Sequence, residues 1–283
     1  MCGTDRQGAH TVVTAMRWAV PELRRSLDEL VPGCSVEVLP SLDSTNSELM
    51  RRARAGVAAP VLLVAECQTA GRGRLGRSWL SGAAAQHDMP LPAAAALPAL
   101  TFSIGLPMAP QDWSGLSLAV GVGVACVLHP ALGLKWPNDI WLHERKLAGI
   151  LVETAAVGAV RYVVVGIGIN IAPRDPAGLS TPPAWLQELL PELDAPAVLA
   201  RLALPLMQVL RQFEAQGFAP FRAAFGQRDV LRGRQVQLSD GGTGTAAGVD
   251  AHGALLVHAG TGVKLVHSAE VSVRPVSVRT QEF

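Results

Sequence analysis

The sequence predicts an α+β protein that ends in a small all-β domain. From residue 41 to residue 228, apolar runs of strand length alternate with helical candidates. After residue 231 the pattern changes to short strands separated by turn glycines, at Gln235–Leu238, Gly248–Asp250, Ala254–His258, Val263–Val266 and Val271–Val276. We therefore expect an N-terminal extension over residues 1–40, a main domain over 41–228, and an SH3-like β-barrel over 229–283.

Composition excludes several classes of protein. The chain has 283 residues, enough to bury a sizeable core, and its formal net charge is only +1. That balance gives no electrostatic reason to expect DNA, RNA or an anionic membrane as the main partner. The first residues lack an apolar leader, and no long uncharged apolar run is typical of a membrane span. We expect a cytoplasmic protein with no specific DNA partner and no membrane partner.

The cysteines and histidines do not predict a metal site. Cys2, Cys34, Cys67 and Cys126 are widely spaced and form no C-x-x-C pair, and the histidines are scattered. Reduced structural thiols fit this pattern best. A tightly held protein-bound metal is not expected, so a divalent ion would have to arrive with a ligand.

Two helices are predicted in the first quarter of the chain. The first covers Pro21–Leu30, with proline near its start. In the second, Thr45 as N-cap and Glu48 form a capping box, Leu49 to Ala55 continue the helix, and Gly56 stops it. Local sequence leaves open whether Ser44, Thr45 and Asn46 merely cap this helix.

A glycine–arginine stretch follows the apolar strand Val61–Ala65. Gly71, Gly73 and Gly76 alternate with arginines 72, 74 and 77. Glycine lets backbone N–H groups approach an anion, and arginine supplies a permanently charged fork of donors. A solvated basic turn or an RNA-binding arginine–glycine tract is the alternative. The stretch is short and directly follows a core strand, which favours an anion-binding loop, and it matches neither the dinucleotide nor the Walker fingerprint.

The middle of the chain contains a proline-rich insertion and two core elements. Residues 81–98 lack periodicity and predict a surface insertion. Leu100–Pro107 predicts a strand, and Trp113–Leu128 a buried helix with small residues for close packing. We assign no chemistry to that helix.

Residues 134–153 predict a hairpin with charged groups near a Trp-Pro turn. Lys135, Asn138 and Asp139 surround the turn, and Lys146 begins an otherwise apolar strand. A lysine at a strand end can extend its ammonium group to solvent, and the alternative is a cation aimed into a site.

The next predicted strand, Tyr162–Ile169, contains Gly166 and Gly168 and ends at Asn170. Glycines inside a strand usually mark close approach by another backbone or by a ligand. A proline-rich loop over 173–184 and helices over 194–216 and 219–226 follow, and Pro205 is a candidate break in the first helix.

Five of these segments together resemble bacterial biotin protein ligases. They are Ser-Thr-Asn at 44–46, Gly-Arg-Gly-Arg-Leu-Gly at 71–76, Lys-Trp-Pro-Asn-Asp at 135–139, Arg-Lys-Leu-Ala-Gly-Ile-Leu-Val-Glu at 145–153 and Gly-Ile-Gly-Ile-Asn at 166–170. Their order and spacing are those of the family, and the resemblance runs from about residue 40 to the end. It implies the short form, without the N-terminal DNA-binding domain. The implied fold is a mixed-sheet catalytic domain, related to class II aminoacyl-tRNA synthetases, followed by the small β-barrel.

The resemblance also implies roles for individual residues. The biotin ring would be bound by Ser44, Thr45, Asn46 and Gln68, whose hydroxyl and amide groups suit a ureido ring. The carboxylate and phosphate side would be held by Gly71, Arg72, Gly73 and Arg74. Lys146 would contact the reacting carboxylate and α-phosphate, with Gly149 in the same binding set. Asp139 would position the acceptor amine or the metal–phosphate unit, and Asn170 would meet the adenine.

The reaction implied by the resemblance has two steps. Biotin and ATP, which brings Mg²⁺, give biotinyl-5′-AMP, and a lysine of the biotin carboxyl carrier protein of acetyl-CoA carboxylase then accepts the biotinyl group. Lys146, Arg72, Arg74 and Asp139 are the expected catalytic residues. The alternatives are a lipoate or octanoate ligase or transferase of the same fold, and a non-catalytic ligand-binding regulatory module. The sequence does not decide between a monomer and a homodimer, which carrier is the acceptor, or how residues 81–98 shape the pocket.

Overall fold

The structure, a computed structural model, describes residues 17–80, 97–174, 176, 179, 181–260, 262–267 and 273–275. Cys2, most of the expected 81–98 insertion and both ends of the last expected strand lie outside the described residues.

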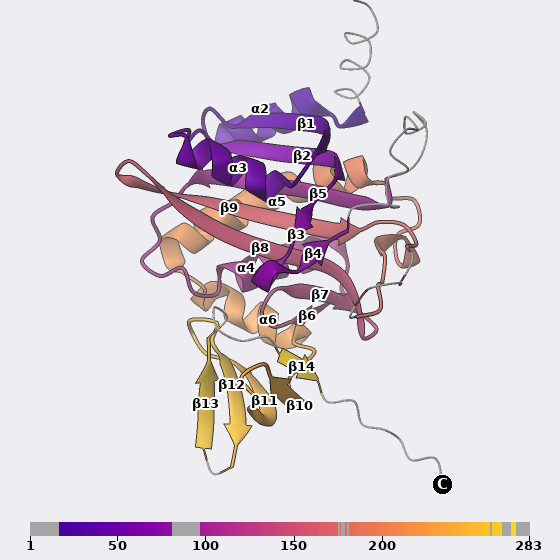
Figure 1. Ribbon diagram of the computed structural model, residues 1–283, viewed down its shortest axis with the longest axis vertical. Helices are drawn as coiled ribbons and strands as arrows, with labels where there is room; N and C mark the ends of the chain where they lie inside the picture. The colour runs from indigo at the N-terminus through magenta and orange to yellow at the C-terminus, as the bar shows by residue number, and fades with distance from the viewer. Residues whose placement is uncertain are drawn as a thin grey trace, which may run out of the picture.

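A seven-stranded mixed sheet forms the centre of the main domain (Figure 1). The strands lie in the order β1-β2-β5-β9-β8-β7-β6, and only β1 and β2 pair in parallel. Their bounds are β1 Ser35–Leu42, β2 Val61–Gln68, β5 Ala99–Pro107, β6 Gly133–Lys135, β7 Asp139–Leu142, β8 Arg145–Val157 and β9 Val160–Asn170. The mixed sheet predicted from the sequence is therefore confirmed. A short separate hairpin, β3 Gly71–Arg72 with β4 Ser78–Trp79, contains the one-turn helix η1 Arg74–Gly76.

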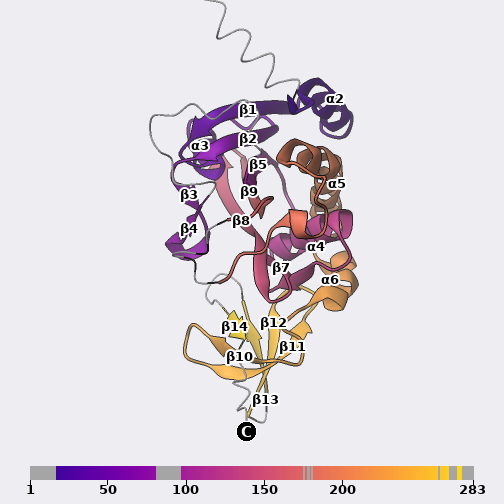
Figure 2. The ribbon, with the colours of Figure 1, turned by 90° about the vertical axis from the view of Figure 1, so that its right-hand side faces the viewer.

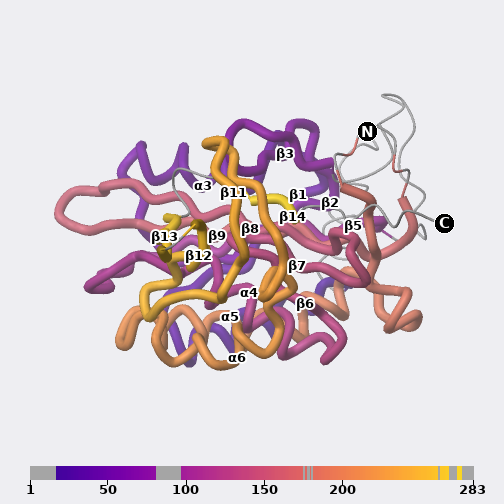
Figure 3. The backbone as a smooth tube through the Cα atoms, turned by 90° about the horizontal axis from the view of Figure 1, so that it is seen from below, coloured from indigo at the N-terminus to yellow at the C-terminus, as the bar shows by residue number. Residues whose placement is uncertain are grey.

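Helices cover both faces of this sheet, as Figures 2 and 3 show. Helices α2, α4, α5 and α6 lie on one face, and α3 lies on the other face together with the β3–β4 hairpin. Their bounds are α2 Val20–Leu30, α3 Thr45–Arg54, α4 Leu116–Leu128, α5 Ala195–Gln216 and α6 Arg222–Arg228, with short turns η2 Leu186–Glu188 and η3 Ala219–Phe221. A hydrophobic cluster lies on each face of the sheet, and strand β2 contributes to both because its side chains alternate between the faces. Leu62 and Val64 belong to the larger cluster, and Leu63 belongs to the cluster under α3.

Two helices differ from their predicted form. Helix α4 begins after Gly115, whose φ of 80° only glycine adopts freely, so it starts three residues later than the sequence predicted. Helix α5 continues through Pro205. The buried neighbours Leu202 and Leu206 offset the hydrogen bond that proline removes. Among the helices of the described part of the chain, none is long and apolar enough to cross a membrane.

The C-terminal strands form an antiparallel sheet at one end of the molecule (Figure 1). The order is β13-β12-β11-β10-β14, with bounds β10 Gln235–Leu238, β11 Thr243–Val249, β12 Leu255–Ala259, β13 Gly262–Val266 and β14 Val273–Pro275. The expected small all-β unit is therefore present as a sheet, and closure into a barrel stays a prediction. Trp136 in the main domain donates from Nε1 to the Gly253 carbonyl at 3.0 Å, and Arg234 pairs with Glu144 at 2.7 Å. These contacts bring the second sheet against the Trp-Pro turn.

Candidate active site

One pocket of about 760 Å³ collects almost all of the predicted site residues. It lies over β8 and β9, between the β3–β4 hairpin and the edge of the C-terminal sheet, and Val273 and Arg274 line its far side. Of the predicted residues, the pocket is lined by Ser44, Thr45, Asn46, Gln68, Arg72, Gly73, Arg74, Asp139, Lys146, Gly149 and Asn170. Gly71 is outside the lining and pairs instead with Trp79 in the hairpin.

The start of helix α3, Gln68 of β2 and Ser103 of β5 form what we call the polar end of the pocket: Ser44, Thr45, Asn46 and Gln68, which line it, and Ser103 behind them. The N-cap is Ser44, whose Oγ accepts from the Ser47 N–H at 3.4 Å, and not Thr45 as the capping-box pattern predicted. Glu48 instead pairs with Arg51 and Arg52 along the helix. Because Ser44 caps the helix, the side chains of Thr45 and Asn46 are left to make other contacts.

Ser44, Thr45, Asn46 and Ser103 are buried, Gln68 is half-buried, and hydrogen bonds join the set. The Thr45 N–H donates to Gln68 Oε1 at 2.8 Å. Ser103 Oγ lies 2.7 Å from both Thr45 Oγ1 and Asn46 Oδ1. Sequence reasoning missed Ser103, although a serine at the centre of the apolar run 100–107 was a usable signal. Buried polar groups are retained when they are hydrogen-bonded, so this end is a fixed set of donors and acceptors.

The two glycines of β9 are explained by side chains that lie against them. A Cβ atom on Gly166 would meet Asn46 Oδ1 at 2.1 Å, and one on Gly168 would meet the Trp79 ring at 2.3 Å. The close approach predicted from the sequence therefore exists, but side chains make it and not another backbone. The missing Cβ of Gly166 leaves room for the Asn46 amide, and the missing Cβ of Gly168 leaves room for the Trp79 ring.

The glycine–arginine stretch folds as the β3–β4 hairpin. A Cβ on Gly71 would lie 2.3 Å from the Trp79 carbonyl oxygen, which explains this glycine. Gly76 has a φ of 72°, which suits glycine, and Leu75 adopts a similar positive φ of 54°. Arg72 pairs with Glu153 at 3.0 Å, and Arg74 donates from Nη1 to Asn138 Oδ1 at 3.4 Å. Burial lowers the pKa of the Arg74 guanidinium.

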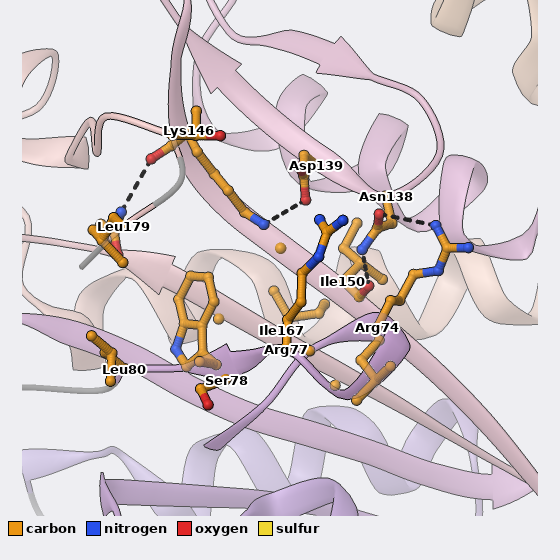
Figure 4. Close-up of a pocket in the computed structure, with 18 of the residues that line it drawn as sticks. Arg74, Arg77, Ser78, Leu80, Asn138, Asp139, Lys146, Ile150, Ile167 and Leu179 are labelled. Carbon is orange, nitrogen blue, oxygen red and sulfur yellow. Dashed lines mark hydrogen bonds and ion pairs between the residues drawn. The ribbon is translucent and has the colours of Figure 1, made fainter. Parts of the chain in front are cut away.

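Lys146 and Asp139 lie at the opposite, cationic end, which we define as Arg74, Arg77, Lys135, Asp139 and Lys146. Lys146 Nζ is 2.7 Å from Asp139 Oδ1, and Figure 4 shows both side chains directed toward each other within the pocket. The Lys146 backbone is held by Pro182 and Ala184 through bonds of 2.9 Å each. The side chain therefore faces the site and does not extend away from it into solvent. Figure 4 also shows Arg74 reaching Asn138 from the hairpin.

Lys135 is a further buried cation that was not among the predicted site residues. Its relative exposure is 9%, and its Nζ lies 5.5 Å from the centre of the Trp141 ring. Burial lowers its pKa from 10.5 to about 8, and Asp139 opposes that shift. Its position at the start of the Lys-Trp-Pro-Asn-Asp segment was the sequence feature that could have identified it as a site residue.

Two indole N–H groups add to this end of the pocket. Within the described residues, Trp79 Nε1 and Trp141 Nε1 are buried without a hydrogen-bond partner, and both tryptophans line the pocket. Buried unpaired donors are costly, and a bound acceptor would remove that cost. Cations and unpaired donors together suit an anionic group.

Asn170 links two segments that line one side of the pocket. Its Nδ2 donates to the Ala184 carbonyl at 2.9 Å and to the Lys146 carbonyl at 3.2 Å. Its Oδ1 accepts from Arg174 Nη1 at 2.5 Å, and Arg174 also donates to the Leu80 carbonyl. The side chain thus ties the end of β9 to the residues around Lys146, and its predicted adenine contact stays a prediction.

In the described ranges, no group of three or more His, Cys, Asp or Glu side chains is placed to hold a metal ion. Two carboxylates line the described pocket: Asp139, which pairs with Lys146, and Glu144, which pairs with Arg234.

The pocket on the mixed sheet has a neutral polar end and a cationic end, so it suits a ligand that carries both neutral polar and anionic groups. Comparison with known proteins identifies the group to which the protein belongs. Sequence models of the Biotin/lipoate A/B protein ligase family and of the Biotin protein ligase C terminal domain match residues 130–170 and 233–274.

The full-length relatives extend this match over most of the chain. The chain is 37% identical over 255 residues to the bifunctional ligase/repressor BirA of Escherichia coli, covering 86% of this chain and 75% of that protein. It is 34% identical to the biotin–[acetyl-CoA-carboxylase] ligase of Paracoccus denitrificans, covering 83% and 98%. The solved biotin protein ligase of Aquifex aeolicus in complex with biotin and ATP superposes with a TM-score of 0.69 at 28% identity, covering 85% and 99%. The chain belongs to the biotin protein ligase family.

Proposed function

We propose that this protein is an ATP-dependent ligase that activates biotin as biotinyl-5′-AMP and transfers the biotinyl group to a lysine of a biotin carboxyl carrier protein. The observation that carries the proposal is the division of a single pocket into a polar end and a cationic end. Biotin has an uncharged ureido ring, an apolar tail and a carboxylate, so it requires both kinds of surroundings in one site.

The polar end is assigned to the ureido ring. Ser44, Thr45, Asn46 and Gln68 line it, and the first three are at most 3% exposed. Fixed hydroxyl and amide groups discriminate by hydrogen bonding, because a ligand that fails to match them leaves buried polar groups unpaired. Such a lining does not suit the apolar tail of lipoate or octanoate.

The cationic end is assigned to the reacting groups. In the first step the biotin carboxylate attacks the α-phosphorus of ATP, pyrophosphate leaves, and negative charge develops on the phosphoryl oxygens. Lys146 and Arg74 stabilise this charge, and Asp139 holds the Lys146 ammonium in place at 2.7 Å. Arg72, which forms an ion pair with Glu153 in this structure, is assigned to the biotin carboxylate. Catalysis in this site is positioning plus electrostatic stabilisation.

In the second step the amine of the carrier lysine attacks the acyl carbon of biotinyl-5′-AMP, and AMP leaves. Asp139, whose carboxylate pairs with Lys146, is assigned to orient that amine. The Mg²⁺ that accompanies ATP would neutralise phosphate charge, and Asp139 and Asn138 are the oxygen-bearing side chains that would share it. Gly71, Gly73 and the arginines beside them would close over the mixed anhydride and exclude water.

The test is ATP/pyrophosphate exchange with biotin, lipoate or octanoate as the only acid. We expect exchange that depends on biotin and on Mg²⁺, with little exchange for the other two. Preference for lipoate or octanoate would support the related ligases, and no exchange with any acid would support a non-catalytic binding module. Transfer is then checked by incorporation of biotin into a purified carrier domain.

Two further expectations belong to this proposal. We propose that the protein does not bind operator DNA specifically, given its charge of +1. Sequence-selective, salt-resistant binding in a gel-shift experiment would contradict this. We also propose a cytoplasmic location, which cell fractionation would test.

A further inference from the structure

Glu153, the last residue of the 145–153 segment, joins the two parts of the site through its side chain. Its Oε1 accepts from Arg72 Nη2 at 3.0 Å, and its Oε2 accepts from Asn46 Nδ2 at 2.9 Å. Its side chain is 20% exposed. Glu153 therefore contacts the hairpin arginine and the polar end at once, although it does not line the pocket itself.

The carboxylate fixes which way the Asn46 amide faces. Asn46 Nδ2 lies 2.9 Å from Glu153 Oε2 and 3.3 Å from the Leu151 carbonyl oxygen, and both of these atoms can only accept. The NH₂ group must occupy that side, so Oδ1 must face Ser103. Gly166 supplies the space in which Oδ1 lies.

The directions of the hydrogen bonds from Asn46 through Ser103 to Thr45 follow from this orientation. Asn46 Oδ1 only accepts, so the single hydroxyl proton of Ser103 must point to it across 2.7 Å. Ser103 Oγ can then only accept from Thr45. The Thr45 hydroxyl has a second acceptor, Gln68 Oε1, at 3.2 Å, but its one proton goes to the nearer Ser103 Oγ at 2.7 Å, because two hydroxyl oxygens at that distance need a proton between them. Gln68 Oε1 still accepts from the Thr45 N–H at 2.8 Å. One carboxylate thus sets the sequence of donors and acceptors from Asn46 to Thr45.

We propose that Glu153 is a positioning residue that determines specificity for the ligand ring by fixing the polarity of the Asn46–Ser103–Thr45 chain. This inference rests on the proposed function, because it takes the polar end as the site of the ureido ring. An amide in place of the carboxylate both donates and accepts. In Glu153→Gln only the longer contact with the Leu151 carbonyl, at 3.3 Å, still requires an Asn46 donor, so the preference for one amide orientation weakens. When Asn46 turns over, Ser103 donates to Thr45 instead, and the chain loses its single polarity.

The sharpest probe is a pair of ligands that differ in one polar group. In 2-iminobiotin the ureido carbonyl, an acceptor, is replaced by an imine that donates when protonated. A polar end of fixed polarity discriminates between the two, and an end with two accessible polarities does so less. We expect the Kd of biotin to rise roughly tenfold in Glu153→Gln and that of 2-iminobiotin to change much less, so that their ratio falls.

The experiment measures both dissociation constants by calorimetry for the full chain and its variants. Glu188→Gln is the matched control, since Glu188 also pairs with an arginine, Arg145, and its side-chain exposure of 22% is close to the 20% of Glu153. It should leave both constants unchanged. Arg72→Gln removes the ion pair but leaves the Asn46 contact with Glu153, so it should weaken both ligands without changing their ratio.

Ser103→Ala keeps the proposal testable if Glu153→Gln does not fold. It interrupts the chain after Asn46 while leaving Glu153 in place, and it should lower the ratio in the same direction. A wild-type ratio in the variants that fold would overturn the role of Glu153. Failure of the wild-type protein to bind biotin is a different result, because it would refute the proposed function itself and the inference with it.

Discussion

The two ends of the pocket are built in opposite ways. At the polar end, the side chains of Thr45, Asn46 and Ser103 are buried and already bonded to one another. At the cationic end, burial lowers the pKa of Arg74 and of Lys135, and two indole N–H groups in the described structure lack an acceptor. The side chains of the polar end hold one another in place without a ligand, whereas the cationic end would be stabilised by an anion.

This difference indicates that the two ends contribute differently to binding and catalysis. A prearranged neutral set gives discrimination, because a mismatched ligand leaves buried groups unpaired. A desolvated set of cations gives strong stabilisation of charge, because it requires little reorganisation when the charge develops. We expect substitutions at the polar end to change biotin affinity and substitutions at the cationic end to change the rate of the first step.

The largest expected effect is that of Lys146→Gln. Removing one cation from a desolvated site should cost on the order of 3 kcal/mol, which is roughly a hundredfold in rate. The loss should fall on adenylate formation, while transfer from added biotinyl-5′-AMP should suffer less. Lys146→Arg should recover only part of the rate because a planar fork does not replace a compact ammonium. Single-turnover measurement of the two half-reactions decides, and a normal first step in Lys146→Gln would remove this lysine from the mechanism.

Gly166→Ala should have the next largest effect, and at the other end. The added methyl group would meet Asn46 Oδ1 at 2.1 Å, and the Asn46 amide is held by Glu153. We expect biotin affinity to fall roughly tenfold while ATP affinity changes less than about twofold. Equilibrium binding of each ligand measures this. Gly226→Ala is the control, since a Cβ there meets nothing within 4 Å. Equal loss of both affinities in Gly166→Ala would show that the two ends are not separable.

Lys135 should give the cationic end a pH dependence. Its pKa in the folded protein is lowered from 10.5 to about 8, so it loses its charge as the pH rises through 8 while the unfolded chain keeps the charge to higher pH. The cost of burying this charge is therefore present below pH 8 and is relieved between pH 8 and 10.5. ATP affinity should fall roughly fivefold from pH 7 to pH 9 as the cation is lost.

Calorimetric titration with ATP across that range measures the effect. In Lys135→Met the fall should largely disappear, and the variant should fold with at least wild-type stability because no charge is buried. An unchanged pH dependence in this variant would assign the titration to another group.

The smallest expected effect concerns residues 71–76 of the β3–β4 hairpin. Its strands pair over only two residues each, Gly71 with Trp79 and Arg72 with Ser78, so its amides should exchange readily without a ligand. Biotinyl-5′-AMP should slow their exchange, since an anion holds the arginines in place. Hydrogen exchange of this segment is compared with that of residues 101–104 in the central strand β5. Equal protection with and without the adenylate would contradict an ordering role for the anion.

Much of this architecture could be predicted from sequence alone because its signals are local. Apolar runs predicted strands β2, β5 and β9, and a proline near a helical run predicted α2. Turn glycines predicted the C-terminal strands except β11, which was expected at Gly248–Asp250 and spans Thr243–Val249. The family resemblance then supplied the candidate residues, and nearly all of them line one pocket. Hydrophobic periodicity and backbone preference act over a few residues, so a single sequence is enough to read them.

Tertiary structure decided the contacts that give the site its chemistry. Ser103, Glu153 and Trp79 reach the site from strands far apart in the chain, and no local pattern records that Glu153 would meet Asn46, 107 residues away. The same holds for Thr45. The local capping pattern predicted Thr45 as the N-cap of α3, but in the structure Ser44 is the N-cap. A side chain's partner depends on which strands become neighbours in the sheet. Sequence therefore determined which polar groups were available, and the packing of β5, β8 and β9 determined the direction in which each of them donates.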